Sequence, residues 1–284
     1  MPKPRIVFLG AGGPFSCLCL DRLVAVSDVA AVVVPRARGG GLRRIARQLR
    51  QRYATRALRK IARRNRIPVI TFGADLRAFD ADLLCTASFP HIIAPDVQSS
   101  ARLGAINVHS SLLPRHRGPD PIFWTYFDDD RTTGVTVHWM TAGIDDGDLI
   151  VQREIDVPRG IDGLDLYLRL AREAAEALAD AVVAIGDGTA TRTPQPDATP
   201  QPHPSEMTWR VDYDAWPAER LFHFLRGYSI RAGASLADRH GALHRVGAVE
   251  RFETTASGVT PGTFVIDGNQ LTIHARDGIV VLRR

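Results

Sequence analysis

The fold is decided near the start of the chain by residues 5–13, which read RIVFLGAGG. The unbroken apolar run before the first glycine is typical of a strand buried on both faces of a parallel sheet. Helix-like stretches separate further strand-like runs at 29–34, 68–72, 82–87, 105–109, 134–140 and 149–154. This alternation predicts an α/β, Rossmann-like, mostly parallel sheet whose ligands sit beyond the carboxyl ends of the strands.

The glycines after the first strand stand where a dinucleotide-binding loop would stand. A G-x-G-x-x-G pattern opening at Gly10 would need glycine at Phe15, and no acidic residue closes the second strand. We therefore expect a tight turn that lets the chain pass close to another site, and we count Gly12 among the candidate binding residues.

The composition changes after residue 188. Residues 189–207 hold five prolines and few apolar residues, which indicates a semi-extended linker. Residues 208–284 contain one helix, near 217–227, and then short strands separated by glycine-bearing turns. The chain is thus predicted to hold an α/β domain over 1–188, the linker, and a small, partly open β-barrel over 208–284.

The composition also limits the class of protein. With 45% hydrophobic and 24% charged residues, the chain resembles an ordinary globular protein, and no apolar run is long enough for a membrane span. No signal-peptide core is recognisable. Cys17, Cys19 and Cys85 fit neither a disulfide framework nor a zinc site, so we expect apolar core residues and a cytoplasmic location.

The net charge of +5 conceals one basic segment. Residues 36–66 carry 13 Arg and Lys and no acid, which leaves −8 on the rest of the chain. A helix is expected over 42–61, with arginines on its polar faces. Such a segment favours an anionic partner, whether nucleic acid, phosphate groups or an acidic carrier; a solvated helix face explains the charge equally well.

The chemistry lies at the centre of the chain. Residues 105–109 predict a strand, and its alternation places Asn107 and His109 on one face at the carboxyl end. Together they can give two hydrogen bonds to one oxygen, as the tetrahedral intermediate of acyl transfer requires. A carboxylate of the loop 143–148, GIDDGD, could orient His109, favour its charged form or accept a proton.

Each of these features has an ordinary structural explanation when taken singly. A histidine at a strand end is more often a satisfied polar residue, and an acidic glycine loop is more often a turn. The acidic run lacks the closing Glu of a calcium loop, so no metal is expected.

Taken together, the motifs resemble the folate-dependent formyltransferase family over residues 5–184: NVH at 107–109, SLLP at 111–114, RG at 117–118, TGVT at 133–136 and GIDDGD at 143–148. The linker and the C-terminal segment resemble the two-domain, methionyl-tRNA formyltransferase-like members, which implies an OB-like barrel over 208–284. The resemblance implies that Asn107, His109 and Asp145 are catalytic, and that Asp146 and Asp148 are bystanders.

The resemblance also implies the co-substrate, 10-formyltetrahydrofolate, and the residues around it. Two loops would cup its pterin ring, with Phe89, His91 and Ile93 in the first and Met140, Thr141, Gly143 and Ile144 in the second. The candidate acceptor-binding residues are Gly12, Ser111, Arg117, Phe123 and Trp124.

The predicted function is transfer of a formyl group from 10-formyltetrahydrofolate to a primary amine. Residues 36–41 and 119–124 depart from the pattern of methionyl-tRNA formyltransferase. We therefore expect a small or carrier-bound amine of specialised metabolism, such as an amino acid, an aminoacyl carrier or an amino sugar. Methionyl-tRNA is the alternative acceptor, and a 10-formyltetrahydrofolate hydrolase is a second alternative. A non-enzymatic nucleic-acid-binding module would leave the three central residues unexplained.

Overall fold

The computed structural model describes residues 3–36, 51–204, 210–228, 234–255 and 258–284. The chain divides into two compact units, each described separately below. The first comprises Met1–Gly118, Thr133–Ile155 and Leu168–Pro200, and the second comprises Pro119–Thr132, Asp156–Tyr167 and Gln201–Arg284. Two segments of the predicted domain 1–188 are therefore part of the second unit. No helix in the described ranges is both long enough and apolar enough to cross a membrane.

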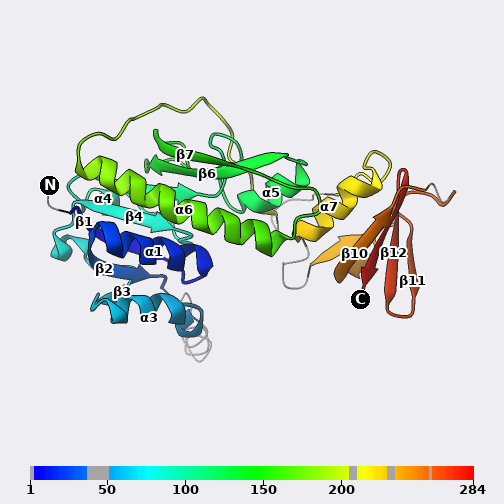
Figure 1. Ribbon diagram of the computed structural model, residues 1–284, viewed down its shortest axis with the longest axis horizontal. Coiled ribbons are helices and arrows are strands. Elements are labelled where there is room, and N and C mark those ends of the chain that lie inside the picture. Colours follow the sequence, from blue (N-terminus) through cyan, green and yellow to red (C-terminus); the bar gives the residue numbers. More distant parts are fainter. Residues whose placement is uncertain (1–2, 37–50, 205–209, 229–233, 256–257) are drawn as a thin grey trace. The chain divides into compact units, whose positions relative to one another are not determined.

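A seven-stranded sheet is the centre of the first unit (Figure 1). Its order is β3-β2-β1-β4-β5-β6-β7, and the first five strands in this order run parallel, whereas β6 is antiparallel to β5. The bounds are β1 Arg5–Gly10, β2 Asp28–Val34, β3 Val69–Thr71, β4 Leu83–Ala87, β5 Ala105–His109, β6 Thr132–Trp139 and β7 Leu149–Asp156. The predicted mostly parallel α/β sheet is confirmed.

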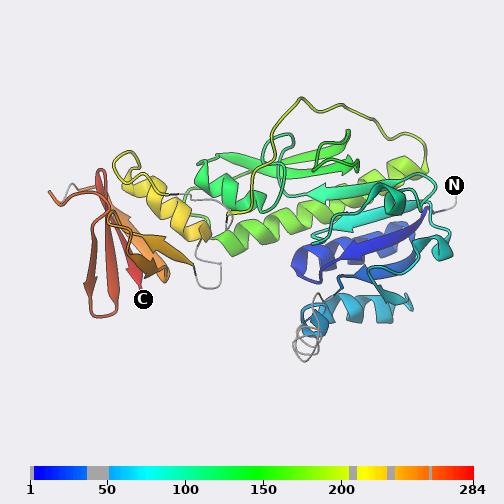
Figure 2. The ribbon, with the colours of Figure 1, turned by 180° about the vertical axis from the view of Figure 1, so that it is seen from behind.

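Helices α1 (Pro14–Val26) and α6 (Gly163–Gly186) lie side by side along the sheet (Figures 1 and 2). Arg22 of α1 joins Glu176 of α6 through an ion pair of 2.8 Å. Helix α3 (Arg56–Arg64) packs against α1. Of the basic helix predicted over 42–61, residues 42–50 lie outside the described residues. The short helices η1 (Leu76–Phe79) and α4 (Pro95–Gln98) connect strands.

The glycine-rich turn after β1 makes a close backbone approach, as its sequence predicted. Gly12 has a φ of +97°, and a Cβ there would lie 2.6 Å from the Ala54 oxygen and from the Thr55 Cα. The turn is fixed to the neighbouring strand because Ser16 Oγ donates to the Ala87 oxygen over 2.8 Å. Gly12 is therefore needed for packing against residues 54–55.

The second unit combines two helices with antiparallel strands. A four-stranded sheet has the order β10-β13-β12-β11, and β8 pairs with β9. The bounds are α5 Pro121–Phe127, α7 Ala218–Tyr228, β8 Ser235–Ala237, β9 Leu243–Arg245, β10 Ala248–Glu253, β11 Phe264–Asp267, β12 Gln270–Ala275 and β13 Gly278–Arg283. These strands form a small β domain, and α7 matches the helix predicted over 217–227.

Candidate active site

Three polar side chains from neighbouring strands meet in the middle of the sheet. Asn107 of β5 pairs in register with Thr86 of β4 on one side and with His138 of β6 on the other. Thr86 Oγ1 donates to Asn107 Oδ1 over 2.6 Å, so the amide is turned with its nitrogen toward His138. Asn107 Nδ2 lies 3.2 Å from His138 Nε2. The amide orientation is therefore set by the threonine hydroxyl.

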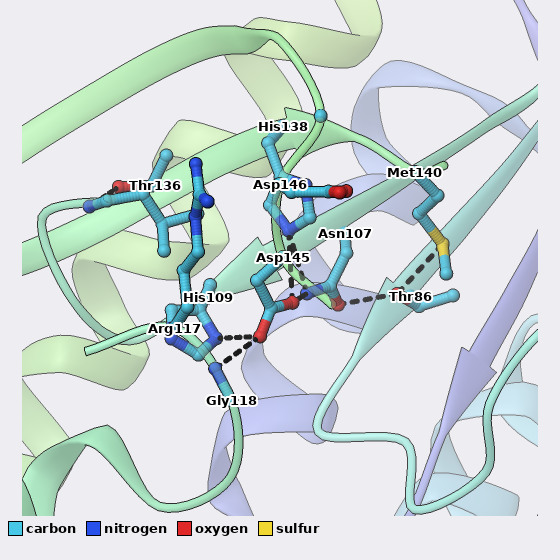
Figure 3. Close-up of polar contacts among 12 residues, drawn as sticks. Thr86, Asn107, His109, Arg117, Gly118, Thr136, His138, Met140, Asp145 and Asp146 are labelled. Carbon is cyan, nitrogen blue, oxygen red and sulfur yellow. Dashed lines mark hydrogen bonds and ion pairs between the residues drawn. The ribbon is translucent and has the colours of Figure 1, made fainter. Parts of the chain in front are cut away.

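The carboxylate of Asp145 contacts side chains of β5 and β6 and one backbone N–H group (Figure 3). Its Oδ1 lies 3.4 Å from both Asn107 Nδ2 and His138 Nε2. Its Oδ2 accepts the Gly118 backbone N–H over 3.0 Å and lies 3.5 Å from His109 Nδ1. The structure thus brings together Asn107, His109 and Asp145, which were predicted from separate motifs.

Two oxygen acceptors lie beside the ring nitrogens of His109. Nε2 lies 2.9 Å from the His116 carbonyl oxygen, which can only accept, and Nδ1 faces the Asp145 carboxylate. Burial nevertheless lowers the pKa of His109, and the negative charge of Asp145 opposes that shift. Burial alone would raise the pKa of Asp145, but His109 and His138 outweigh it and hold that pKa below its usual range. Asp145 is therefore ionised at neutral pH.

The loop between β6 and β7 carries two closely packed glycines beside Asp145, of which Gly147 meets backbone and Gly143 meets a side chain. A Cβ on Gly143 would lie 1.9 Å from Asp146 Oδ2, and one on Gly147 would lie 2.0 Å from the Trp139 oxygen. Asp145 itself has a φ of +50°, a left-handed conformation that non-glycine residues rarely adopt. Asp146 instead accepts the hydroxyl of Thr141. Of the two adjacent aspartates, Asp145 therefore contacts Asn107 and His109, and Asp146 does not.

The two loops predicted to cup the pterin ring are joined by one buried side chain. Gln98 Nε2 donates to the carbonyl oxygens of Ile93 and Thr141, over 2.7 Å in each case. Ile93 is buried in a core cluster against which Phe89 and Met140 pack. His91 stacks on Phe72, with ring centroids 5.1 Å apart. Gly143 and Ile144, farther along the second loop, are exposed.

The candidate acceptor residues do not form one group. Arg117 is buried and donates to Gln195 and to carbonyls of residues 196 and 198. Ser111 Oγ donates to the Arg115 oxygen over 2.6 Å. Phe123 and Trp124, in the second unit, are each 3% exposed and pack edge to face at 5.1 Å.

Sequence reasoning missed Thr86, His138, Gln98 and Gln195. Thr86 is a polar residue in an otherwise apolar strand, whereas His138 shares its strand with three threonines and does not stand out. Gln98 and Gln195 lie in a short helix and a proline-rich segment, where glutamine is unremarkable. Among the residues that the structure describes, no group of three or more His, Cys, Asp or Glu could hold a metal ion.

Comparison with known proteins matches this chain to one family. The model of the formyl transferase family matches residues 5–182. Methionyl-tRNA formyltransferase of Listeria monocytogenes is 30% identical, over 98% of this chain and 89% of its own, and that of Anaeromyxobacter dehalogenans is 32% identical over 98% and 90%.

A solved structure of WlaRD, a sugar 3N-formyl transferase, shares the fold. It superposes with a TM-score of 0.70 at 15% identity, covering 100% of this chain and 98% of its own. The sequence matches span most of the chain, including the strand that carries Asn107 and His109 and the loop that carries Asp145. The chain therefore belongs to the formyl transferase family.

Proposed function

We propose that this enzyme moves a formyl group from 10-formyltetrahydrofolate to a primary amine, with Asn107, His109 and Asp145 as its catalytic residues. One observation carries the proposal: the amide of Asn107 and the imidazole of His109 both point at one carboxylate, within 3.5 Å. Donors that converge so closely can also converge on one oxyanion.

Asn107 and His109 stabilise the tetrahedral intermediate. When the amine nitrogen bonds to the formyl carbon, the carbonyl oxygen becomes negatively charged, and Asn107 Nδ2 and protonated His109 donate to it. His109 has two N–H groups, so it exchanges one of its present acceptors, the Asp145 carboxylate or the His116 carbonyl oxygen, for this oxyanion. Thr86 keeps the nitrogen of the Asn107 amide, rather than its oxygen, on this side. The bond from the formyl carbon to N10 of the folate then breaks.

Asp145 favours the charged form of His109, against the effect of burial, and directs the proton. Its pKa is lowered, so it supplies a permanent negative charge beside a buried imidazole whose pKa would otherwise fall further. The attacking amine loses one proton and N10 of tetrahydrofolate gains one. Asp145 assists this transfer directly or through water, and no proton is gained or lost overall.

For the folate donor, the two loops tied by Gln98 supply the binding surface. Backbone carbonyl oxygens and N–H groups along these loops would hydrogen-bond to the polar edge of the pterin ring. The apolar side chains of Phe89, Ile93 and Met140 form the core beneath the loops. No step of this proposal uses a metal ion.

For the acceptor, we propose a small or carrier-bound amine. The basic segment 36–66 supports this choice, because its first residues depart from the pattern of methionyl-tRNA formyltransferase. Part of its described charge is also neutralised within the protein, since Arg64 pairs with Asp21 at 2.5 Å. The burial of Phe123 and Trp124 weakens the other sequence argument, that bulky side chains reshape an acceptor pocket.

Methionyl-tRNA is the second candidate acceptor, favoured by similarity to methionyl-tRNA formyltransferases over 98% of the chain. In that case the C-terminal strands, as an OB-like barrel, and the arginines of 52–66 would contact RNA phosphates. A screen of amines with the folate donor, monitored by mass gain of a formyl group, separates the candidates. Salt-sensitive binding of initiator tRNA followed by its formylation would favour RNA, and formate release without any amine would identify a hydrolase.

The catalytic assignment has its own test. Asn107→Ala and His109→Ala should each lower turnover by about 10²–10³, the usual cost of losing an oxyanion donor. Near-normal formyl transfer by either purified variant would refute the assignment.

A further inference from the structure

The proline-rich segment beyond α6 is bonded to the catalytic loop. Thr193 forms an isolated antiparallel bridge with Leu149, the first residue of β7, with hydrogen bonds of 3.0 and 2.8 Å. One residue earlier, Arg192 lies 3.7 Å from Asp148. A segment whose composition predicts a semi-extended linker is thus attached where the loop 143–148 ends. We call residues 192–198 the strap.

Within the strap, both the nitrogen and the oxygen of the Gln195 side-chain amide form hydrogen bonds. Nε2 donates to the carbonyl oxygens of Asp145 and Gly147, over 3.1 and 2.6 Å. Oε1 accepts from Nε and Nη2 of Arg117, over 3.1 and 2.8 Å. Both N–H groups and the oxygen are therefore occupied, and Arg117 fixes which end of the amide faces the loop.

Arg117 connects this amide to the carboxylate of Asp145. Its guanidinium is buried, and it also donates to the carbonyl oxygens of Pro196 and Ala198 over 3.0 and 3.1 Å. The next residue, Gly118, donates its backbone N–H to Asp145 Oδ2 over 3.0 Å. Asp145 is consequently held at both ends, its carbonyl by Gln195 and its carboxylate by Gly118.

Asp145 needs such support. Its φ of +50° is in the left-handed region, where a side-chain-bearing residue remains only when its surroundings fix it. We propose that Gln195 is a positioning residue for formyl transfer: it holds the backbone of Asp145 in the conformation that places the carboxylate beside His109. This inference rests on the proposed function, since it requires Asp145 to be the catalytic carboxylate.

The charge state of His109 reports the position of Asp145. The titratable groups that act on this imidazole are Asp145, which favours its charged form, and His116 and His138, which oppose it. Because the carboxylate lies 3.5 Å from Nδ1, a small displacement weakens the one interaction with a charged neighbour that favours protonation. A loosened loop therefore lowers the pH at which His109 titrates.

Gln195→Met tests the proposal, because methionine keeps the length of the side chain and removes its hydrogen bonds. We expect kcat for the best acceptor of the amine screen to fall about 10- to 100-fold, as for a misplaced catalytic group. In NMR spectra of the full chain without substrate, the His109 titration should move to lower pH. Gln201→Met, in the same proline-rich segment, is the matched control and should change neither quantity.

Gln195→Glu is the second variant, and its kcat is measured if Gln195→Met fails to fold. Its carboxylate still accepts from Arg117 but repels the carbonyls of Asp145 and Gly147, so kcat should fall as in the first variant. A folded Gln195 variant with wild-type kcat and an unmoved His109 titration would overturn the positioning role. Near-normal transfer by Asp145→Asn would instead overturn the proposed function, whatever the Gln195 variants do.

Discussion

Each of the two units contains a partly buried aspartate with a histidine nearby, and the two clusters differ in one partner. Asp145 in the first unit faces His109 and His138. Asp129 in the second unit faces Arg159, which contacts both of its oxygens. Both aspartates have a left-handed backbone, with φ of +50° and +62°, and both have lowered pKa values.

The nature of the cationic partner distinguishes the proposed catalytic cluster around Asp145 from the cluster around Asp129. Arg159 is charged at any working pH and binds the carboxylate with a planar fork, so Asp129 has a fixed partner. His223 beside it is buried, which lowers its pKa to about 4 and keeps it neutral. The partners of Asp145 are imidazoles, whose charge can change during a reaction. A carboxylate becomes useful to catalysis when its partners can gain and lose protons.

The largest expected effect comes from neutralising Asp145. Asp145→Asn should lower kcat by about 10²–10³ while the protein stays folded, because Asn also tolerates a left-handed backbone. Steady-state formyl transfer measures the loss. Asp146→Asn, the next residue in the loop, is the control and should keep most of its activity. If kcat of Asp145→Asn fell by less than about tenfold, the Asp145 cluster could no longer be distinguished from the Asp129 cluster by a role in catalysis.

The same substitution in the other cluster should affect stability. Asp129→Asn leaves the Arg159 guanidinium without its charge partner, and because the pair is partly exposed we expect a loss of about 1–2 kcal/mol in the free energy of unfolding. Urea denaturation measures the change, and kcat per folded molecule should stay unaltered. Reduced turnover without reduced stability would show that this cluster also serves catalysis.

Thr86 sharpens the comparison within the catalytic cluster. Thr86→Val removes the hydroxyl that orients the Asn107 amide, so kcat should fall about tenfold, the equivalent of roughly 1.4 kcal/mol for one lost hydrogen bond. Thr86→Ser keeps the hydroxyl and should retain turnover. An unchanged kcat in the valine variant would mean that other contacts orient the amide.

The last prediction concerns pH and His223. Its pKa is about 4 in the folded chain and 6.5 ordinarily, so as pH falls through this range the unfolded chain binds a proton that the folded chain does not. The free energy of unfolding should therefore decline between pH 6.5 and 4, and His223→Gln should decline less steeply over the same range. Equal slopes for the two proteins in urea titrations would contradict a buried, neutral His223.

The strands of the first unit and the place of Asn107 and His109, the proposed catalytic residues on β5, could be predicted, because they depend on local patterns. β5 was predicted with its exact bounds, and strand alternation put Asn107 and His109 on one face. Thr86 and His138 could not be identified this way, since they reach Asn107 only through the order of strands in the sheet. That order is fixed by packing between distant segments.

Gln195 was hidden for a different reason. Prolines around it indicate a semi-extended linker, and the sequence says nothing of a partner 78 residues away, the separation of Gln195 and Arg117. Arg117 itself was predicted to bind the acceptor, whereas its guanidinium is occupied by the strap. A long polar side chain can reach many different partners, so which contacts it makes depends on the tertiary structure and cannot be predicted from the local sequence.

The strap also limits where this protein can be joined to another in a chimera. A joint chosen from composition would fall near residue 188, where the proline-rich segment begins. That joint keeps Asn107, His109 and Asp145 but exchanges Gln195 for a foreign residue. Recombination within the family should therefore tolerate a crossover after residue 198 better than one ten residues earlier, although neither cut touches a strand of the sheet.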